Sequence, residues 1–345
     1  MIITVSKNAF SGLFAKKSEP MTDQLAYCCI HSECGRIRLT PAADGLSCVN
    51  GHFFSFAPGT NVPVFAKEPE DANEYARHNA AEVHDNALRW VFSTFGTDEA
   101  TLRESLIARL QLTPGSRILV TGAGAGNDLP YLVRSLQGKG QIFAQDLAQE
   151  MLLAGVSRHR AGLGDSSVEL HFSVSDATNL PFVDGYFDAA YHFGGINLFP
   201  NIRKGIEEMN RVVKPGGKVV IGDEGVAPWL RDTEYGKMLI RNNPLYACEI
   251  PLALLPESAR SVQLSWELSN CFYVLEFSVA LQPPPIDIDV QHIGARGGSI
   301  RTRYFGQLEG VDPALRDRIY SEAARLGQSR VDYVESLLRS GLPKT

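Results

Sequence analysis

The clearest pattern along the chain is a short apolar run that ends in three glycines set at every second position. Residues 118–120 form the run, and its lack of polar alternation predicts a strand buried on both faces. The glycines are Gly122, Gly124 and Gly126. An apolar stretch with helical spacing follows over residues 129–136. Strand, glycine turn and helix predict the opening of a nucleotide-binding βαβ unit, although a plain tight turn could use the same glycines.

Alternating strands and helices continue over the next hundred residues. Further strands are predicted over residues 141–145, 168–174, 187–193 and 218–221, with an amphipathic helix over 201–213 that the sequence Lys-Pro-Gly-Gly ends. This alternation predicts a parallel sheet with helices on both faces, and a ligand at the carboxyl ends of the strands. Asp146 and Asp176 stand at two such ends. Asp146 has about the spacing at which a carboxylate meets a ribose diol, and it could equally cap the next helix.

Four segments stand in order along this part of the chain: RILVTGAGAGNDL, AQDLAQEMLLA, SDATNLPFVDGYFDAAY and EEMNRVVKPGGKVVI. They resemble the successive motifs of class I S-adenosylmethionine (SAM)-dependent methyltransferases, closest to the small-molecule group that includes quinone methyltransferases. The resemblance covers about residues 75–280 and implies an α/β fold, Rossmann-like and doubly wound, with a seven-stranded sheet. The GxGxG spacing also disfavours a nicotinamide cofactor, whose fingerprint is GxGxxG.

The resemblance implies SAM as cofactor and a set of residues that bind it. These are Gly122, Ala123, Gly124, Gly126, Asn127, Asp128, Asp146, Leu147, Met151, Asp176, Ala177 and Tyr75. Helices expected over residues 74–95 and 98–112 would cover the pocket, with His84 and Trp90 as further candidates. The family usually has an acid two residues before the first glycine, where this chain has Val120. Binding of the amino-acid end of SAM is then altered or taken over by Asp128.

The end of the fourth predicted strand and the loop that follows it, residues 191–197, are expected to hold the catalytic residues Tyr191, His192 and Phe193. Methyl transfer is an in-line displacement that depends mainly on orientation. The two aromatic rings could face the sulfonium cation, and His192 is the candidate base if the acceptor must lose a proton. The alternative is that His192 has a structural role only and transfers no proton. Asp223 and Glu224 could bind an amine, act as a base or form a solvated turn.

Three classes of function follow. The first is methyl transfer to a small molecule or natural-product intermediate. The second is a non-methylating SAM enzyme that releases methylthioadenosine, by intramolecular cyclisation or aminocarboxypropyl transfer. The third is a binding protein that keeps the fold without turnover.

Cysteine and histidine gather near the N-terminus in the spacing of a zinc ribbon. The predicted ligands are His31, Cys34, Cys48 and His52. Paired ligands on two turns can close a tetrahedron around zinc. The segment resembles the zinc ribbons that precede some methyltransferase domains, including the ribosomal-RNA guanine group. Cys28 or Cys29 could replace His31, and a metal-free ribbon with packed thiols is the alternative.

Composition limits the remaining choices. The chain has 345 residues, is 44% hydrophobic and carries a net charge of −6, which gives no bulk reason to expect nucleic acid. No apolar run reaches transmembrane length and no signal peptide is evident, so the cytoplasm is expected. The expected partner is a small-molecule substrate, and a homodimer stays open. Four parts are predicted: a ribbon-like unit over 1–66, a helical cap over 67–112, the SAM-binding domain over 113–280 and a C-terminal helical extension over 281–345.

Overall fold

The structure is a computed structural model that describes residues 26–66, 79–160, 167–293, 299–305, 308 and 311–343. The chain divides into two compact units, Met1–Pro283 and Pro284–Thr345. The predicted linker over residues 67–73 and the cofactor candidate Tyr75 lie outside the described residues.

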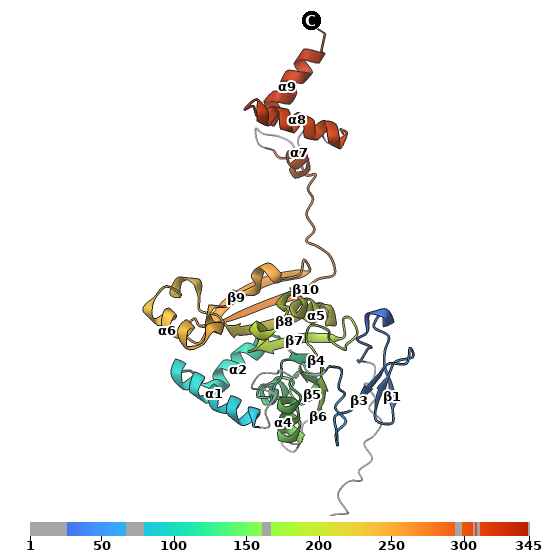
Figure 1. Ribbon diagram of the computed structural model, residues 1–345, viewed down its shortest axis with the longest axis vertical. Coiled ribbons are helices and arrows are strands. Elements are labelled where there is room, and N and C mark those ends of the chain that lie inside the picture. Colours follow the sequence, from blue (N-terminus) through green and yellow to red (C-terminus); the bar gives the residue numbers. More distant parts are fainter. Residues whose placement is uncertain are drawn as a thin grey trace, which may run out of the picture. The chain divides into compact units, whose positions relative to one another are not determined.

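A seven-stranded sheet organises the first unit (Figure 1). Its strand order is β6 (Ser167–Val174), β5 (Lys139–Asp146), β4 (Arg117–Thr121), β7 (Phe187–Phe193), β8 (Val213–Glu224), β10 (Phe272–Val279) and β9 (Ala259–Glu267). The first five strands pair in parallel, whereas β10 runs antiparallel to both β8 and β9. The predicted Rossmann-like α/β fold is confirmed.

Six α-helices are described in this unit. They are α1 (Ala80–Phe95), α2 (Glu99–Ala108), α3 (Leu129–Ser135), α4 (Gln149–Arg160), α5 (Ile202–Val212) and α6 (Glu234–Asn242). Asp98 caps α2 by accepting a hydrogen bond from the Thr101 amide at 2.8 Å. Helix α5 ends at Val212, and the predicted breaker lies at the start of strand β8, which begins at Val213. None of the described helices combines the length and apolar character needed to cross a membrane.

Alternation along β4 divides the core between the two faces of the sheet. Leu119 packs in the cluster that contains Ile206 of α5, whereas Ile118 and Val120 pack in the cluster that contains Leu106 of α2. Successive strand side chains point to opposite faces, so a continuous apolar run is what a strand covered on both sides requires.

The N-terminal residues form a small antiparallel sheet that shares a core with the large one. Its elements are the 3-10 helix η1 (Ser32–Cys34) and strands β1 (Thr40–Ala42), β2 (Gly45–Ser47) and β3 (Phe53–Ser55). Tyr27 is 2% exposed and stacks on both Phe65 and Phe182, at centroid distances of 5.3 and 5.2 Å. Val64 pairs with Val174 at the end of β6. The small sheet is therefore built into the first unit.

The second unit contains α7 (Ile300–Phe305), α8 (Pro313–Arg325) and α9 (Arg330–Gly341). Helices α8 and α9 contact one another, with Ala323 and Val334 buried. Side chains of Asp312 and Ser329 accept hydrogen bonds from the first turns of α8 and α9. The prediction for this region is a C-terminal helical extension over residues 281–345.

A buried carboxylate joins the small sheet to the large one. Glu208 of α5 is fully buried and accepts hydrogen bonds from Arg36 at 3.0 Å and Arg211 at 2.7 Å. It also accepts the Leu180 amide at 2.9 Å. Three segments distant in the chain therefore meet at one charge.

Replacing this carboxylate should destabilise the whole first unit. We expect Glu208→Gln to lower the free energy of unfolding by about 3 kcal/mol, because it leaves two partly buried guanidinium groups without their shared charge. Urea unfolding of the full chain measures the effect, with Glu207→Gln on the same helix as the matched control. Equal stability of the two variants would contradict this role for Glu208.

Candidate functional site

A cavity of about 310 Å³ lies at the carboxyl ends of β4, β5, β7 and β8. One side is formed by the glycine turn after β4, by Gln145–Ala148 after β5 and by Ser175–Ala177 after β6. The other side is formed by α1, by the loop after β7 and by residues near β8 and β10. This is the edge of the sheet at which a ligand was predicted.

The turn after β4 depends on glycine at two positions that line the cavity. Gly122 has φ +60°, and a Cβ there would lie 2.8 Å from Cε1 of His192. Gly124 has φ +52°. Glycine adopts these left-handed conformations without strain, so the backbone can approach a ligand closely.

Asp146 holds this turn in place. Its Oδ2 accepts the Gly124 amide at 2.7 Å and its Oδ1 accepts the Ala148 amide at 2.8 Å. Burial raises the pKa of this carboxyl group, while the backbone N–H bonds oppose the shift. Each oxygen retains further acceptor capacity for a ligand. The two alternatives from the sequence, helix cap and ribose contact, are thus compatible in one residue.

Asp176 occupies the corresponding place after β6. Its Oδ1 accepts hydrogen bonds from the Thr178 amide at 2.7 Å and from the Thr178 hydroxyl at 2.8 Å. These bonds fix the carboxylate at the cavity wall, beside Ala177.

A buried arginine, which the sequence analysis did not find, lines the cavity from α2. Arg103 is 3% exposed and pairs with Asp128 at 2.6 Å and with Glu99 at 2.7 Å. Asp128 also lines the cavity, as predicted. A glutamate four residues earlier in a helix was the only sequence signal for the pairing of Arg103.

The three expected catalytic residues separate into two environments. Tyr191 is fully buried outside the cavity lining, and its hydroxyl donates to Oδ1 of Asp128 at 3.2 Å. This corrects the expectation that its ring faces the cavity, because the hydroxyl of Tyr191 is bound to the Arg103–Asp128 pair. His192 and Phe193 do line the cavity.

His192 is buried and neutral. Its Nδ1 lies 3.0 Å from the Thr121 hydroxyl, and Nε2 has no hydrogen-bond partner within the described residues. Burial lowers the pKa of the imidazole, against the opposing field of Asp223. A neutral imidazole can accept a proton, so the base and the structural interpretation both stay open.

Most predicted cofactor residues line the cavity together. They are Gly122, Ala123, Gly124, Asn127, Asp128, Asp146, Leu147, Met151, Asp176 and Ala177. Gly126 completes the turn but lies outside the lining, and Trp90 is 53% exposed, whereas His84 lines the cavity. The sequence analysis missed the apolar wall of Leu88, Val91, Phe92, Leu245, Leu268 and Phe272.

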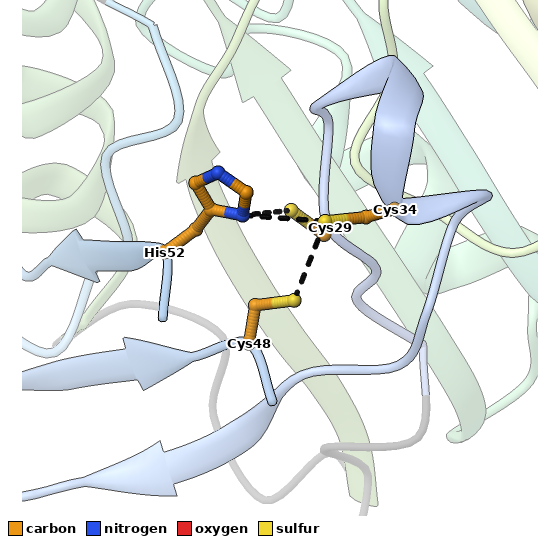
Figure 2. Close-up of side chains that lie close together, drawn as sticks. All are labelled: Cys29, Cys34, Cys48 and His52. Carbon is orange, nitrogen blue, oxygen red and sulfur yellow. Dashed lines mark hydrogen bonds between the residues drawn. The ribbon is translucent and has the colours of Figure 1, made fainter. Parts of the chain in front are cut away.

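Three thiols and an imidazole converge in the N-terminal sheet (Figure 2). Nδ1 of His52 lies 3.2 Å from Sγ of Cys34 and 3.6 Å from Sγ of Cys29. The Sγ atoms of Cys34 and Cys48 are 3.7 Å apart. Ligands bound tetrahedrally to zinc at about 2.3 Å are separated by roughly 3.8 Å, so the donor set fits this ion.

The fourth place in this cluster belongs to Cys29 and not to His31. The ring of His31 is stacked on that of His52 at a centroid distance of 3.9 Å and is outside the group of four. The other three predicted ligands do converge. We propose that this cluster binds structural zinc, since four protein donors leave no open position for chemistry.

Comparison with known proteins gives a match over the glycine turn and the strands around it. Residues 119–221 match the family model for a methyltransferase domain. The chain is 33% identical over 127 residues to the demethylmenaquinone methyltransferase of Desulfitobacterium hafniense, covering 37% of this chain and 49% of that protein. It is 32% identical over 115 residues to the ubiquinone/menaquinone biosynthesis C-methyltransferase of Cupriavidus pinatubonensis, covering 33% and 46%. The chain thus spans about half the length of the curated relatives it matches.

Solved structures of similar fold include phosphoethanolamine N-methyltransferase 2 of Haemonchus contortus, in complex with SAM. The identity is 16% and the TM-score 0.47, covering 62% of this chain and 61% of that one.

The glycine turn can be tested by SAM binding. We expect Gly124→Val to abolish binding, because the side chain would enter the cavity and strain a left-handed residue. Gly138→Val is the matched control, since Gly138 has φ +84° in open space. Asp146→Ala should weaken binding by at least about tenfold, since a charge-assisted hydrogen bond contributes about 1.5–3 kcal/mol. Calorimetry measures the affinities. Wild-type affinity in Gly124→Val and Asp146→Ala would reject this cofactor site.

The metal cluster can be tested by elemental analysis of protein purified without chelators. We expect about one zinc per chain in the wild type and in His31→Ala, and loss of zinc in Cys29→Ser and Cys48→Ser. Retention in Cys29→Ser with loss in His31→Ala would favour the ligand set first predicted. Protein without metal in all four samples would show that the ribbon binds none.

Proposed function

We propose that this chain is a SAM-dependent methyltransferase that acts on a small molecule. The observation that carries the proposal is the cavity at the strand ends, where the glycine turn, Asp146 and Asp176 lie together. The match of residues 119–221 to a methyltransferase domain supports it. We also propose a cytoplasmic location, because cysteine thiols, such as those of the metal cluster, stay reduced in that compartment.

The polar side of the cavity offers contacts for each part of the cofactor. Asp146 and Asp176 supply carboxylate oxygens for the ribose and the base. Arg103, fixed by Asp128 and Glu99, presents a cation for the carboxylate of the amino-acid end. Asp128 offers an acceptor for the amino group, in place of the acid that Val120 replaces. Val120 itself is 2% exposed and packs in the core.

SAM supplies a methyl group on a sulfonium centre, and the protein must orient the acceptor toward it. Phe193 and Phe199 line the cavity beside His192 and exclude water from the reacting groups. His192 is positioned to accept a proton where the acceptor must lose one. Orientation of the acceptor in the cavity is the main contribution of these residues.

The acceptor is proposed to be a quinone-type or related natural-product precursor. The second side of the cavity is predominantly apolar and suits a hydrophobic ring. The two relatives described above are named as a demethylmenaquinone methyltransferase and a ubiquinone/menaquinone biosynthesis C-methyltransferase.

A second candidate is a non-methylating SAM enzyme. It is favoured by the apolar residue at Val120, because a different contact at the amino-acid end could present another sulfonium carbon to a nucleophile.

Product analysis tests the proposal. With SAM and a mixture of demethylated quinols under reducing conditions, we expect S-adenosylhomocysteine and a methylated acceptor, and neither product from Gly124→Val. Mass spectrometry identifies both products. Methylthioadenosine in place of S-adenosylhomocysteine would establish the second candidate, and SAM binding without any product would leave a binding protein.

A further inference from the structure

One carboxyl group faces the apolar side of the cavity. Glu224 is the last residue of β8 and lines the cavity together with Phe92 of α1, Phe193 of β7 and Phe272 of β10. A polar group among aromatic walls costs free energy unless it is hydrogen-bonded, so its placement calls for a partner. His192 also lines the cavity, and its buried Nε2 has no hydrogen-bond partner among the residues described.

The backbone around Glu224 is fixed. Its N–H donates to Oδ1 of Asp223 at 2.8 Å, and its carbonyl accepts from Nδ2 of Asn197 at 2.8 Å. The register of β8 places it opposite Phe272 of β10. The carboxyl group is therefore held at the cavity by a rigid strand end.

The carboxyl group of Asp223 lies beside that of Glu224 at the same strand end. Asp223 is fully buried, and its two oxygens accept the amides of Asn197 at 2.7 Å and Glu224 at 2.8 Å. The carboxyl groups of Asp223 and Glu224 are also within hydrogen-bonding reach of each other. A hydrogen bond between them needs one proton. Both Asp223 oxygens already accept backbone N–H groups, whereas Glu224 faces aromatic side chains, so the proton is assigned to Glu224.

The surroundings keep Glu224 neutral. Burial, with the adjacent Asp223 carboxyl group, raises the pKa of Glu224 to about 9. The titratable groups that face the pair are Tyr246, Tyr273, Cys248 and His192. Burial raises the pKa of the first three and lowers that of His192, so all four are uncharged near pH 7. The nearby guanidinium of Arg231 donates to the carbonyl oxygens of Val226 and Cys248.

We propose that Glu224 is the acceptor-binding residue of the cavity and selects a hydrophobic ring that carries a hydroxyl group. Its O–H donates to Asp223, which leaves its carbonyl oxygen to accept the hydrogen bond of that hydroxyl. The apolar walls hold the ring. An ionised carboxylate would instead favour an amine cation, so the shared proton determines the class of acceptor. This inference rests on the proposed methyltransferase function.

Binding of simple ring probes to the full chain, saturated with S-adenosylhomocysteine, tests the inference. The probes are 2-naphthol, its methyl ether 2-methoxynaphthalene, which cannot donate a hydrogen bond, and 1-naphthylmethylamine as the cation. At pH 7 we expect the wild type to bind 2-naphthol about tenfold more tightly than the ether, the effect of one hydrogen bond, and to bind the amine more weakly than 2-naphthol. Calorimetry measures each affinity.

Two variants isolate the carboxyl group. Glu224→Gln should keep the preference for 2-naphthol, because an amide can donate to Asp223 and accept from the hydroxyl. Glu224→Leu should abolish the preference while S-adenosylhomocysteine still binds. Three results would overturn the inference: a preference for the amine in the wild type, loss of the preference for 2-naphthol in Glu224→Gln, or an unchanged preference for 2-naphthol in Glu224→Leu. Failure of S-adenosylhomocysteine to bind the wild type would instead reject the proposed function, which separates the two outcomes.

Discussion

The hydrogen bond from the Gly124 amide to Asp146 is the constraint on which the cavity depends. It joins the turn after β4 to the end of β5, while the second oxygen of Asp146 accepts the amide of Ala148, directly before α4. The ends of these two neighbouring parallel strands are thereby fixed relative to one another. The glycines permit the turn, but the carboxylate selects its conformation, since left-handed glycines have many alternatives in an isolated peptide.

The parts of the site that could be predicted are those that depend on local sequence. The glycine spacing, Asp146 and Asp176 each depend on a strand end and its following turn, and the structure brings them together. Arg103, Leu245 and Phe272 reach the cavity only through tertiary packing of α2, the segment after α6 and β10, for which no local pattern exists. Tyr191 shows a different limit: it shares a strand face with Phe193 by period-two alternation, but only Phe193, at the end of β7, lines the cavity, and the alternation does not tell how far along the strand the cavity reaches. In the ribbon, spacing alone did not choose between Cys29 and His31, because ring stacking of His31 on His52 depends on how η1 is folded.

The fold was more predictable than the site, for a physical reason. A sheet covered on both faces requires continuous apolar strands, and helices that alternate with them leave few topologies. The helix predicted over residues 201–213 is observed as α5 (Ile202–Val212), which ends just before the Lys-Pro-Gly-Gly sequence. By contrast, the cavity combines opposite chemistries on its two sides, carboxylates and a guanidinium opposite aromatic rings, and this contrast arises only where segments distant in sequence converge.

The buried meeting of Arg36 with Glu208 has a consequence for how the chain folds. Residues of the small sheet leave the ribosome long before α5, yet Tyr27 and Phe182 pack in one aromatic core, and the Cys28 amide bonds to the Pro181 carbonyl. Contacts of such sequence separation form slowly, because loop closure must come before their stabilisation. Residues 26–66 therefore cannot complete these contacts until the centre of the chain has been synthesised. During that interval their aromatic side chains lack the partners that bury them in the folded protein, and such exposed apolar surface is what chaperones bind.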